Sequence, residues 1–275
     1  MKSQLKSLRI PTPEDIEIHR DYYWRRESER RIETAQEAEK YVDEVGFLFA
    51  LTDIRRPGPS LYTAICGRRD AHLPRNVQKD PESSLTWRVK DEVMSRGKIY
   101  YAKVVSGLAT FIAPRLVPYF YSVFGVSRGA EATTLSPDAR LVLRILRKEW
   151  ELASSDLRVA AKFPDRKRLT KALDELQKRM KVVPSDVLYE PMFTYIWSVP
   201  EARFQSEFSK RVDRDIALRE IARAFLNGAG MTFKGELSKV LGISRPEAGR
   251  ANLSLVDDGY AELLSPGVYV RRDLL

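Results

Sequence analysis

The second half of the chain repeats one order of helix caps, helical patterns and a hairpin turn. In the later copy, Asp213–Leu226 is the first predicted helix, ended by Asn227-Gly228, and Thr232 is expected to cap the second. Ser244-Arg245-Pro246-Glu247 has the spacing of a capping box and sets the start of the third. A hairpin around Ser265-Pro266-Gly267 follows, pairing Tyr260–Leu264 with Val268–Arg271. Three short helices and a hairpin restrict the possible folds strongly.

The earlier copy has the same order. Ser136-Pro137 opens a helix whose apolar face ends at Trp150, and Ser155 is expected to cap a second helix. Asp165–Met180 is the third helix, with apolar residues at three- and four-residue steps. A hairpin with its turn at Pro184-Ser185 completes the copy. Three helices followed by a hairpin wing, in tandem, predict winged-helix units and a mainly helical α+β fold.

The first half of the chain is less regular. We expect an N-terminal arm with a charged helix over Glu14–Ile32, then a winged-helix-like unit that starts at the Thr34–Glu37 capping box. In this unit Ser60 caps a helix, Asp70–Ser84 is a loop, and Ser106-Gly107 lies within a hairpin; Ser127–Thr134 is a linker. The expected domains are 1–33 for the arm and charged helix, 34–134 for the first unit, 135–200 for the second and 201–275 for the third.

Charge narrows the possible partners. The chain has 275 residues with 47 Lys and Arg against 38 Asp and Glu, a formal net charge of +9. Such an excess favours nucleic acid or an anionic membrane surface. The most apolar stretch, Val117–Val126, is interrupted by Pro118 and Gly125 and is too short to cross a bilayer. Because the basic N-terminus also lacks an apolar signal core, we expect no membrane partner and a cytoplasmic protein.

Residue types also limit the chemistry. Cys66 is the one cysteine, so an intramolecular disulfide is excluded. With His19 and His72 as the two histidines, a Cys/His zinc site is not expected, and no metal ligand is assigned. The sequence has neither a Gly-x-Gly-x-x-Gly turn nor a Walker loop, so no nucleotide cofactor is predicted.

Cations on the third helix of each copy are the candidate contacts to DNA. Arginine and lysine near a helix N-terminus favour phosphate, and arginine can pair with guanine. Residues near the last wing could reach the sugar-phosphate backbone, giving affinity with little sequence choice. The candidate DNA-binding residues are Arg166, Lys167, Arg168, Lys171, Arg245, Arg250, Asn252, Arg271 and Arg272. A solvated charged face is the alternative interpretation.

Two other features have a functional and a structural interpretation. Tyr119-Phe120-Tyr121 could form a stacking platform for bases, but an apolar helix at this spacing is more often part of a core. Asp43 and Glu44 could serve acid–base chemistry if burial shifted one pKa. Adjacent residues on a helix point about 100° apart, so surface carboxylates are expected.

The first half nevertheless resembles a known family. The segments TAQEAEKYVDEVGFLFAL, PSLYTAICGRR and WRVKDEVMSRGKIYYAKVVSGLATFIAPRLVPYFYS are similar to proteins related to the AlkZ/YcaQ-type bacterial DNA glycosylases. The resemblance extends from about Thr34 to the C-terminus. It implies tandem winged helices and DNA as the partner, and enzymes of this type remove alkylated bases and unhook interstrand crosslinks.

Catalytic members of that family carry a Gln-x-Gln or Gln-x-Asp motif in the first unit. The corresponding stretch here is Phe47–Leu51, which contains no glutamine. Apolar side chains cannot position an attacking water. The nearest candidate catalytic carboxylate is Asp53, so the family's usual mechanism is not expected.

Three hypotheses follow. The first is a DNA-binding protein, repair-related or regulatory, that lacks the standard glycosylase residues and binds double-stranded or damaged DNA. The second is a glycosylase that removes alkylated or crosslinked bases with Asp53 or a neighbouring carboxylate. The third is a protein-interaction module, which predicts a broad apolar surface and no positive groove.

Overall fold

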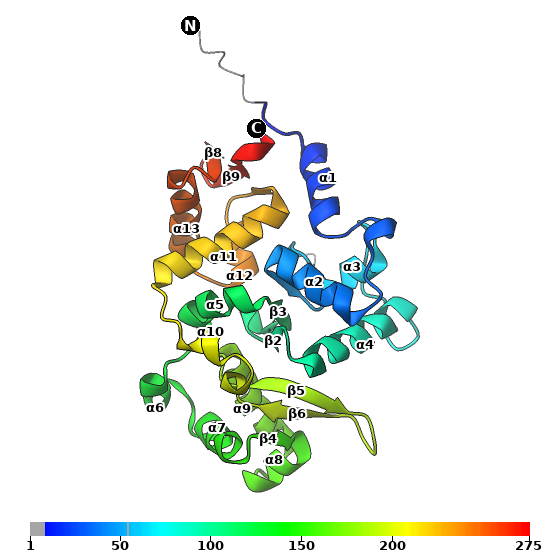
Figure 1. The fold of residues 1–275 in the computed structure, drawn as a ribbon, viewed down its shortest axis with the longest axis vertical. Helices are drawn as coiled ribbons and strands as arrows, with labels where there is room; N and C mark the ends of the chain where they lie inside the picture. The colour runs from blue at the N-terminus through cyan, green and yellow to red at the C-terminus, as the bar shows by residue number, and fades with distance from the viewer. Residues whose placement is uncertain (1–8, 54) are drawn as a thin grey trace, which may run out of the picture.

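Three small antiparallel sheets lie among the helices of the computed structural model, which describes residues 9–53 and 55–275 (Figure 1). The first unit contains α2 (Ala35–Val45), β1 (Phe47–Phe49), α3 (Leu61–Cys66), α4 (Pro81–Arg96), β2 (Tyr100–Ala102) and β3 (Thr110–Ile112). The second contains α7 (Pro137–Glu149), β4 (Glu151–Ala153), α8 (Ser154–Ala160), α9 (Arg166–Lys178), β5 (Val183–Leu188) and β6 (Thr194–Ser198). The third contains α11 (Arg214–Ala229), β7 (Met231–Thr232), α12 (Glu236–Leu241), α13 (Arg245–Asp257), β8 (Ala261–Ser265) and β9 (Val268–Arg271).

All three units share one topology. Each runs helix, strand, helix, helix, strand, strand, and the last strand lies in the middle of its sheet: the orders are β1-β3-β2, β4-β6-β5 and β7-β9-β8. This is the winged-helix arrangement, with the second and third strands forming the wing. The predicted fold class, a mainly helical α+β fold of tandem winged-helix units, is confirmed. The domain boundaries drawn from the sequence remain a proposal.

Shorter elements connect the units. Four helices lie outside the repeats: α1 (Pro13–Tyr23), α5 (Val117–Phe124), α6 (Glu131–Thr134) and α10 (Gln205–Ser209). The 3-10 turns are η1 (Ser28–Arg30), η2 (Val105–Gly107), η3 (Pro114–Leu116), η4 (Arg128–Ala130), η5 (Pro200–Ala202) and η6 (Arg272–Leu274). The predicted irregular arm lies mostly in residues 1–8, outside the described residues, and α1 begins directly after its Thr12 cap.

The predicted caps are mostly confirmed. Thr34 and Ser244 each form a complete capping box, with Glu37 and Glu247 respectively. The predicted single caps Ser60 and Ser136 start their helices. Asp165, predicted as the first residue of the third helix, is instead its cap. These motifs act within four residues, so local sequence is sufficient to predict them.

Several predicted boundaries in the first half and the linker are wrong. The charged helix ends at Tyr23 and not at Ile32, because Arg25 adopts a left-handed backbone with φ +53°. Helix α4 starts at Pro81, within the predicted loop. The linker holds η4 and α6, and Glu131 in α6 is buried against Arg147 and Lys181. Burial alone would raise the pKa of Glu131, but the hydrogen bonds from these two cations lower it to about 2.

The second half needs corrections too. Pro184 and Ser185 lie inside β5, at a bulge in its pairing with β6, so they do not form the wing turn. Thr232 is buried in β7, and α12 starts after Gly235 without a side-chain cap. Helix α11 continues through the predicted stop at Asn227-Gly228 and ends at Ala229. Ser155 caps nothing, because α8 already begins at Ser154.

Two residues whose spacing along their helices predicts core positions, Trp150 and Ile216, are exposed. Trp150 follows α7 with φ +68° and is 66% exposed, and Ile216 on α11 is also exposed. Both lie at the ends of their helices, where the apolar spacing continues but no neighbouring element covers the side chain. The predicted core positions of the third helix of the second unit are buried: Leu169, Ala172, Leu173 and Leu176 in α9, and Met180 just after it.

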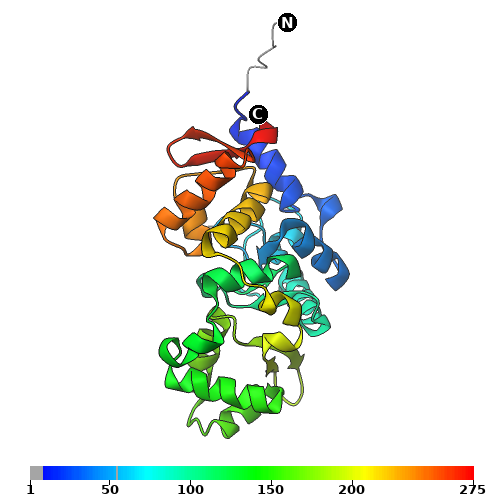
Figure 2. The ribbon, with the colours of Figure 1, turned by 60° about the vertical axis from the view of Figure 1, so that its left-hand side comes forward.

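The units are joined unequally. The second has its own core between α7, α8, α9 and its sheet, whereas one core unites the first unit's sheet, α5 and most of the third unit. Phe47 and Phe49 of β1 and Phe225 of α11 belong to this shared core. The first and third units therefore form one body, and the second extends from it at one end (Figures 1 and 2).

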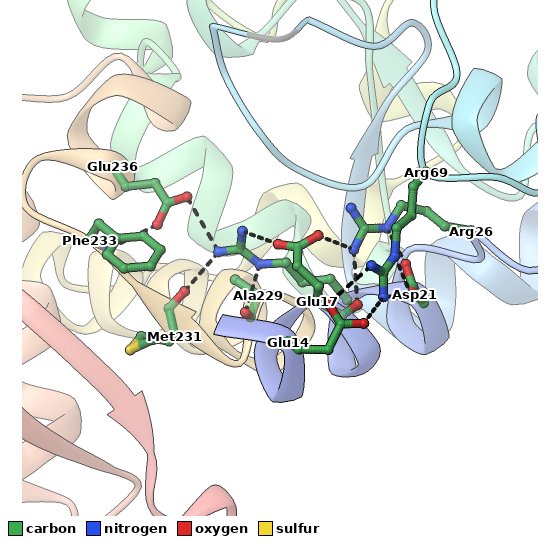
Figure 3. Close-up of polar contacts among 10 residues, drawn as sticks. Glu14, Glu17, Asp21, Arg26, Arg69, Ala229, Met231, Phe233 and Glu236 are labelled. Carbon is green, nitrogen blue, oxygen red and sulfur yellow. Dashed lines mark hydrogen bonds and ion pairs between the residues drawn. The ribbon is translucent and has the colours of Figure 1, made fainter. Parts of the chain in front are cut away.

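Helix α1 fastens the third unit to the first. The buried Arg20 donates from Nε to the carbonyl of Ala229 and from Nη2 to that of Met231, both at 3.1 Å, and Nη2 lies 3.6 Å from Glu236. The adjacent residue, Asp21, accepts a hydrogen bond from Arg69 Nε of the first unit at 2.7 Å. Figure 3 shows both groups of contacts around α1.

Candidate nucleic-acid interface

A basic groove runs beside helix α9 of the second unit. Its volume is about 1160 Å³. Helix α9 begins at its Asp165 cap and buries Leu169 and Leu173, so its other face is free to carry charge. The groove is lined from this helix by Arg166, Lys167, Lys171, Lys178 and Arg179. Three of the four α9 residues predicted to bind DNA, Arg166, Lys167 and Lys171, therefore lie together on one surface.

All three units contribute walls to the groove. The first unit provides Ser106 and Gly107 from η2, and the third provides Leu241 and Gly242 at the end of α12. At Gly242 the approach is close: a Cβ atom there would displace the Ser106 hydroxyl, and φ is +68°. The left-handed backbone therefore favours glycine at this junction.

The acidic residues in the groove are already engaged. Asp174 accepts from Lys103 Nζ at 2.9 Å, and Glu175 accepts from the backbone and hydroxyl of Ser136 at 2.7 and 2.6 Å. Within the described part of the chain, Arg166, Lys167 and Lys171 form no ion pair. The cations thus give the groove its available charge.

Arg168 faces another way. It donates from Nε and Nη2 to Asp138 of α7, both at 2.7 Å, and its guanidinium lies 4.9 Å from the centre of the Phe163 ring. These contacts lower the pKa of Asp138, chiefly through the hydrogen bond from Arg168. Arg168 is absent from the walls of the groove and ties α9 to α7.

The third unit has a smaller pocket, of about 320 Å³, between α12, α13 and its wing. Arg245 and Asn252 of α13 line it together with Lys234. Asn252 is 6% exposed, so its side chain belongs largely to the interior, while Arg245 is exposed at the helix start. Arg250 is exposed as well and lies 3.6 Å from Asp215. Of the three predicted α13 contacts, the two arginines are accessible.

The predicted contacts near the last wing are engaged internally. Arg271 donates from Nη1 to the carbonyl and side-chain oxygens of Asn227, both at 3.0 Å, and its side chain is 12% exposed. This corrects the expectation that Arg271 lies free beside the wing. Arg272 is more exposed but pairs with Glu262, with Nε at 2.8 Å from the carboxylate.

Asp53 lies on a turn and lines none of the pockets described here. It accepts hydrogen bonds from the backbone N–H of Arg55 at 2.9 Å and from its Nε at 3.2 Å, with Arg56 Nη1 at 3.6 Å. The backbone hydrogen bond, followed by the arginine charges, lowers the pKa of Asp53. The preceding stretch 47–50 is buried and apolar. Nothing in this geometry aims Asp53 at a bound substrate.

The remaining sequence candidates have structural roles. Phe120 is buried in the shared core, with Tyr119 and Tyr121 packed against it, so this helix forms no exposed platform. Asp43 is an exposed carboxylate 3.7 Å from Arg115, and Glu44 pairs with Arg25 at 3.1 Å. The structural interpretation of both features is confirmed.

Sequence reasoning missed the groove's other walls. Lys178 and Arg179 continue the basic side of the third helix and line the groove, whereas the candidate residues stopped at Lys171. Ser106, Gly107 and Gly242 had no chemical signal to identify them, since their role comes from the meeting of three units. A continuous basic face to the end of α9 was the one available clue.

Comparison with known proteins agrees with this fold. The AlkZ-related family matches residues 32–241 of the chain. The chain belongs to the AlkZ-related family. This confirms the resemblance seen in the sequence, over a range that starts two residues earlier and ends within the third unit.

Solved structures extend the comparison. The DNA glycosylase AlkZ of Streptomyces sahachiroi matches with a TM-score of 0.58 and 13% identity, covering 93% of this chain and 70% of that one. The DIP2311 protein of Corynebacterium diphtheriae, also 13% identical, covers 77% of this chain and 40% of its own, and its TM-score of 0.21 carries no weight. No curated protein matches the chain. The AlkZ-related fold thus extends over nearly the whole chain.

A search of residues 9–53 and 55–275 for a helix long and apolar enough to cross a membrane found none.

Proposed function

We propose that this AlkZ-related protein binds double-stranded DNA, including damaged DNA, in a repair or regulatory role and without the glutamine chemistry of catalytic relatives. The observation that carries the proposal is the groove beside α9, into which Arg166, Lys167 and Lys171 point without acidic partners. A winged-helix third helix normally lies in the DNA major groove with its wing on the adjacent backbone.

The arrangement of charge suits a polyanion. Lys167 and Lys171 are four residues apart on α9, so they share one face at a separation of about 6 Å along the helix axis. Phosphate contacts of this kind give affinity and register with little dependence on base sequence. A net charge of +9 adds long-range attraction to any nucleic acid.

The repair-related part of the proposal rests on relatives. The AlkZ structure that shares this fold is a DNA glycosylase, and its name makes damaged DNA the natural partner to test. The stretch 47–51 contains Phe, Leu and Ala side chains, of which those at 47–50 are buried. Such side chains neither position water nor stabilise a developing positive charge on the sugar, so we propose binding without this chemistry.

The salt dependence of binding tests the proposal. We expect the wild-type protein to bind a labelled duplex with an affinity that falls steeply with salt, by a slope of about 0.9 per phosphate contact in a log–log plot. The double variant Lys167→Glu/Lys171→Glu should reduce that slope by about 2 and weaken binding roughly tenfold or more. Fluorescence anisotropy over a salt series measures both quantities.

The matched control is Lys40→Glu/Lys148→Glu, which makes the same change in net charge. Lys40 is exposed on α2 and Lys148 on α7, and neither lines the groove. The control should retain the wild-type slope. Equal losses in both double variants, or salt-independent binding by the wild type, would overturn the assignment of the groove.

A further inference from the structure

A second cavity opens on the other flank of α9. It has a volume of about 660 Å³ and lies between the wing of the second unit (β5 and β6), helices α8 and α9, and strand β2 of the first unit. Its size falls within the roughly 300–1,000 Å³ of ligand pockets. Figure 1 shows this wing reaching from α9 toward α4.

Aromatic side chains form much of its wall: Tyr101, Phe193, Tyr195 and Trp197. Phe193 and Tyr195 meet edge to face with centroids 5.1 Å apart, as do Tyr195 and Trp197 at 5.8 Å. The inner two are fixed by hydrogen bonds, because Trp197 Nε1 donates to Ser154 Oγ at 2.9 Å and Tyr195 Oη accepts from Lys90 Nζ at 2.8 Å. The wall is therefore rigid before any ligand arrives.

The cavity adjoins the basic groove. Arg166, Thr170 and Asp174 of α9 line both. Arg158 adds positive charge to the cavity, whereas Lys103 is paired with Asp174. Ser155 provides a hydroxyl, and Asp156 and Glu190 provide carboxylates. A strand whose phosphates follow Arg166 would pass the mouth of an aromatic cavity that also holds hydrogen-bonding groups.

We propose that this cavity accepts an unpaired nucleobase from DNA held in the groove. The inference rests on the proposed function and adds a preference for DNA in which one base has left the helix. Aromatic rings stack on any base, and the loss of such a contact weakens binding from about fivefold to about a hundredfold. Arg158 and Arg166, which line the cavity, can attract the attached phosphate.

The test compares two labelled duplexes of one sequence, one fully paired and the other with a single unpaired thymidine. We expect the full-length wild-type protein to bind the second at least fivefold more tightly in fluorescence anisotropy. Phe193→Leu should abolish that preference and leave affinity for the paired duplex unchanged. Phe193 is 46% exposed, so leucine can replace it without opening a core.

The control is Tyr22→Leu, which removes an aromatic ring that is 49% exposed on α1, away from both cavities. It should retain the preference. A second readout places 2-aminopurine at the unpaired position: its fluorescence should be quenched on binding wild type and Tyr22→Leu, and much less on binding Phe193→Leu.

The outcomes separate the two proposals. Tight, salt-dependent binding of both duplexes with equal affinity would overturn the base cavity and leave the DNA groove standing. Failure to bind either duplex would overturn the proposed function and with it the cavity. A preference that survives in Phe193→Leu would also refute the cavity.

Discussion

Arg166 and Arg168 lie two residues apart on α9, yet they have different surroundings. Arg166 lines the groove, while Arg168 is held by Asp138 and the ring of Phe163. A separation of two residues turns a helix by about 200°, so the two side chains leave on nearly opposite faces. Both residues are arginines in the same run of cations, so the sequence alone does not distinguish them. The position of α7 determines which of the two is available to a ligand.

The neighbours of Asp53 likewise determine whether its carboxylate is available to a ligand. Its partners are Arg55 and Arg56, and its pKa is lowered. We expect the wild-type protein to release no free base from alkylated duplex DNA, and Asp53→Asn to be indistinguishable from it. Mass spectrometry of the released bases measures this, with AlkZ from Streptomyces sahachiroi as the positive control. Release by the wild type that disappears in Asp53→Asn would instead establish the carboxylate as catalytic.

Among the helices and strands, a feature can be predicted from the sequence when the interaction that forms it joins residues close together in the chain. The capping boxes at Thr34 and Ser244 were predictable because each motif is complete within four residues. Strands β4 and β7 were not recognised. They are three and two residues long and exist through pairing with β6 and β9, which follow more than 35 residues later in the sequence. A pattern of period two cannot be seen in so few residues.

The turn of the second unit's wing was predicted at the wrong place for a related reason. Pro184-Ser185 has the composition of a turn, but β5 accommodates it at a bulge, where proline costs no ladder hydrogen bond. The aromatic cavity could not be predicted either, because it joins residues far apart in the sequence: Tyr101 and Trp197 are separated by 96 positions. The basic face of α9 was predictable because it lies on one continuous helix.

Helix α1 connects the third unit to the first, and the contribution of Arg20 to this contact can be tested. Arg20→Met should keep the aliphatic stem but leave the carbonyls of Ala229 and Met231 without their donor and remove the cation beside Glu236. Leaving buried acceptors unpaired costs about 1–3 kcal/mol, so we expect a loss of about 3 kcal/mol in the free energy of unfolding.

Chemical denaturation followed by circular dichroism measures that loss. Arg75→Met serves as the control, because Arg75 is an exposed loop residue and the same chemical change should alter stability by less than about 0.5 kcal/mol. Comparable stability of Arg20→Met and Arg75→Met would show that α1 contributes little to holding the third unit.

At the scale of the whole molecule, the width of the groove depends on how the second unit sits against the rest. The first and third units share one core, which also includes Val183 of β5. Val187 and Tyr195 of the second wing pack against the other core of the first unit, and polar contacts add to this junction. Lys103 of the first unit reaches Asp174 of α9, and α4 reaches the second wing through Lys90 and Asp91. The third helix of the first unit is thereby occupied by another unit's wing, which leaves α9 and α13 to meet a ligand.

A buried ion pair lies at the junction between α4 and the wing of the second unit. Lys90 is 1% exposed; its Nζ lies 2.6 Å from Asp91 Oδ1 and donates to Tyr195 Oη, while Asp91 accepts from Tyr189 Oη at 2.6 Å. Breaking a buried ion pair from one side costs about 3–5 kcal/mol, since the remaining charge stays buried. Lys90→Met should therefore destabilise the protein by about that amount in chemical denaturation.

The charge, and not the shape, should account for the loss. Lys90→Met/Asp91→Asn keeps the volume of both side chains and removes both charges, so it should recover most of the stability, because a buried neutral amide costs less than a buried carboxylate. If the double variant is as unstable as Lys90→Met, the contact between α4 and the wing depends on packing of the lysine stem. If both variants are as stable as the wild type, the junction is held by its other contacts, which are the apolar packing of Val183 and the pair of Lys103 and Asp174.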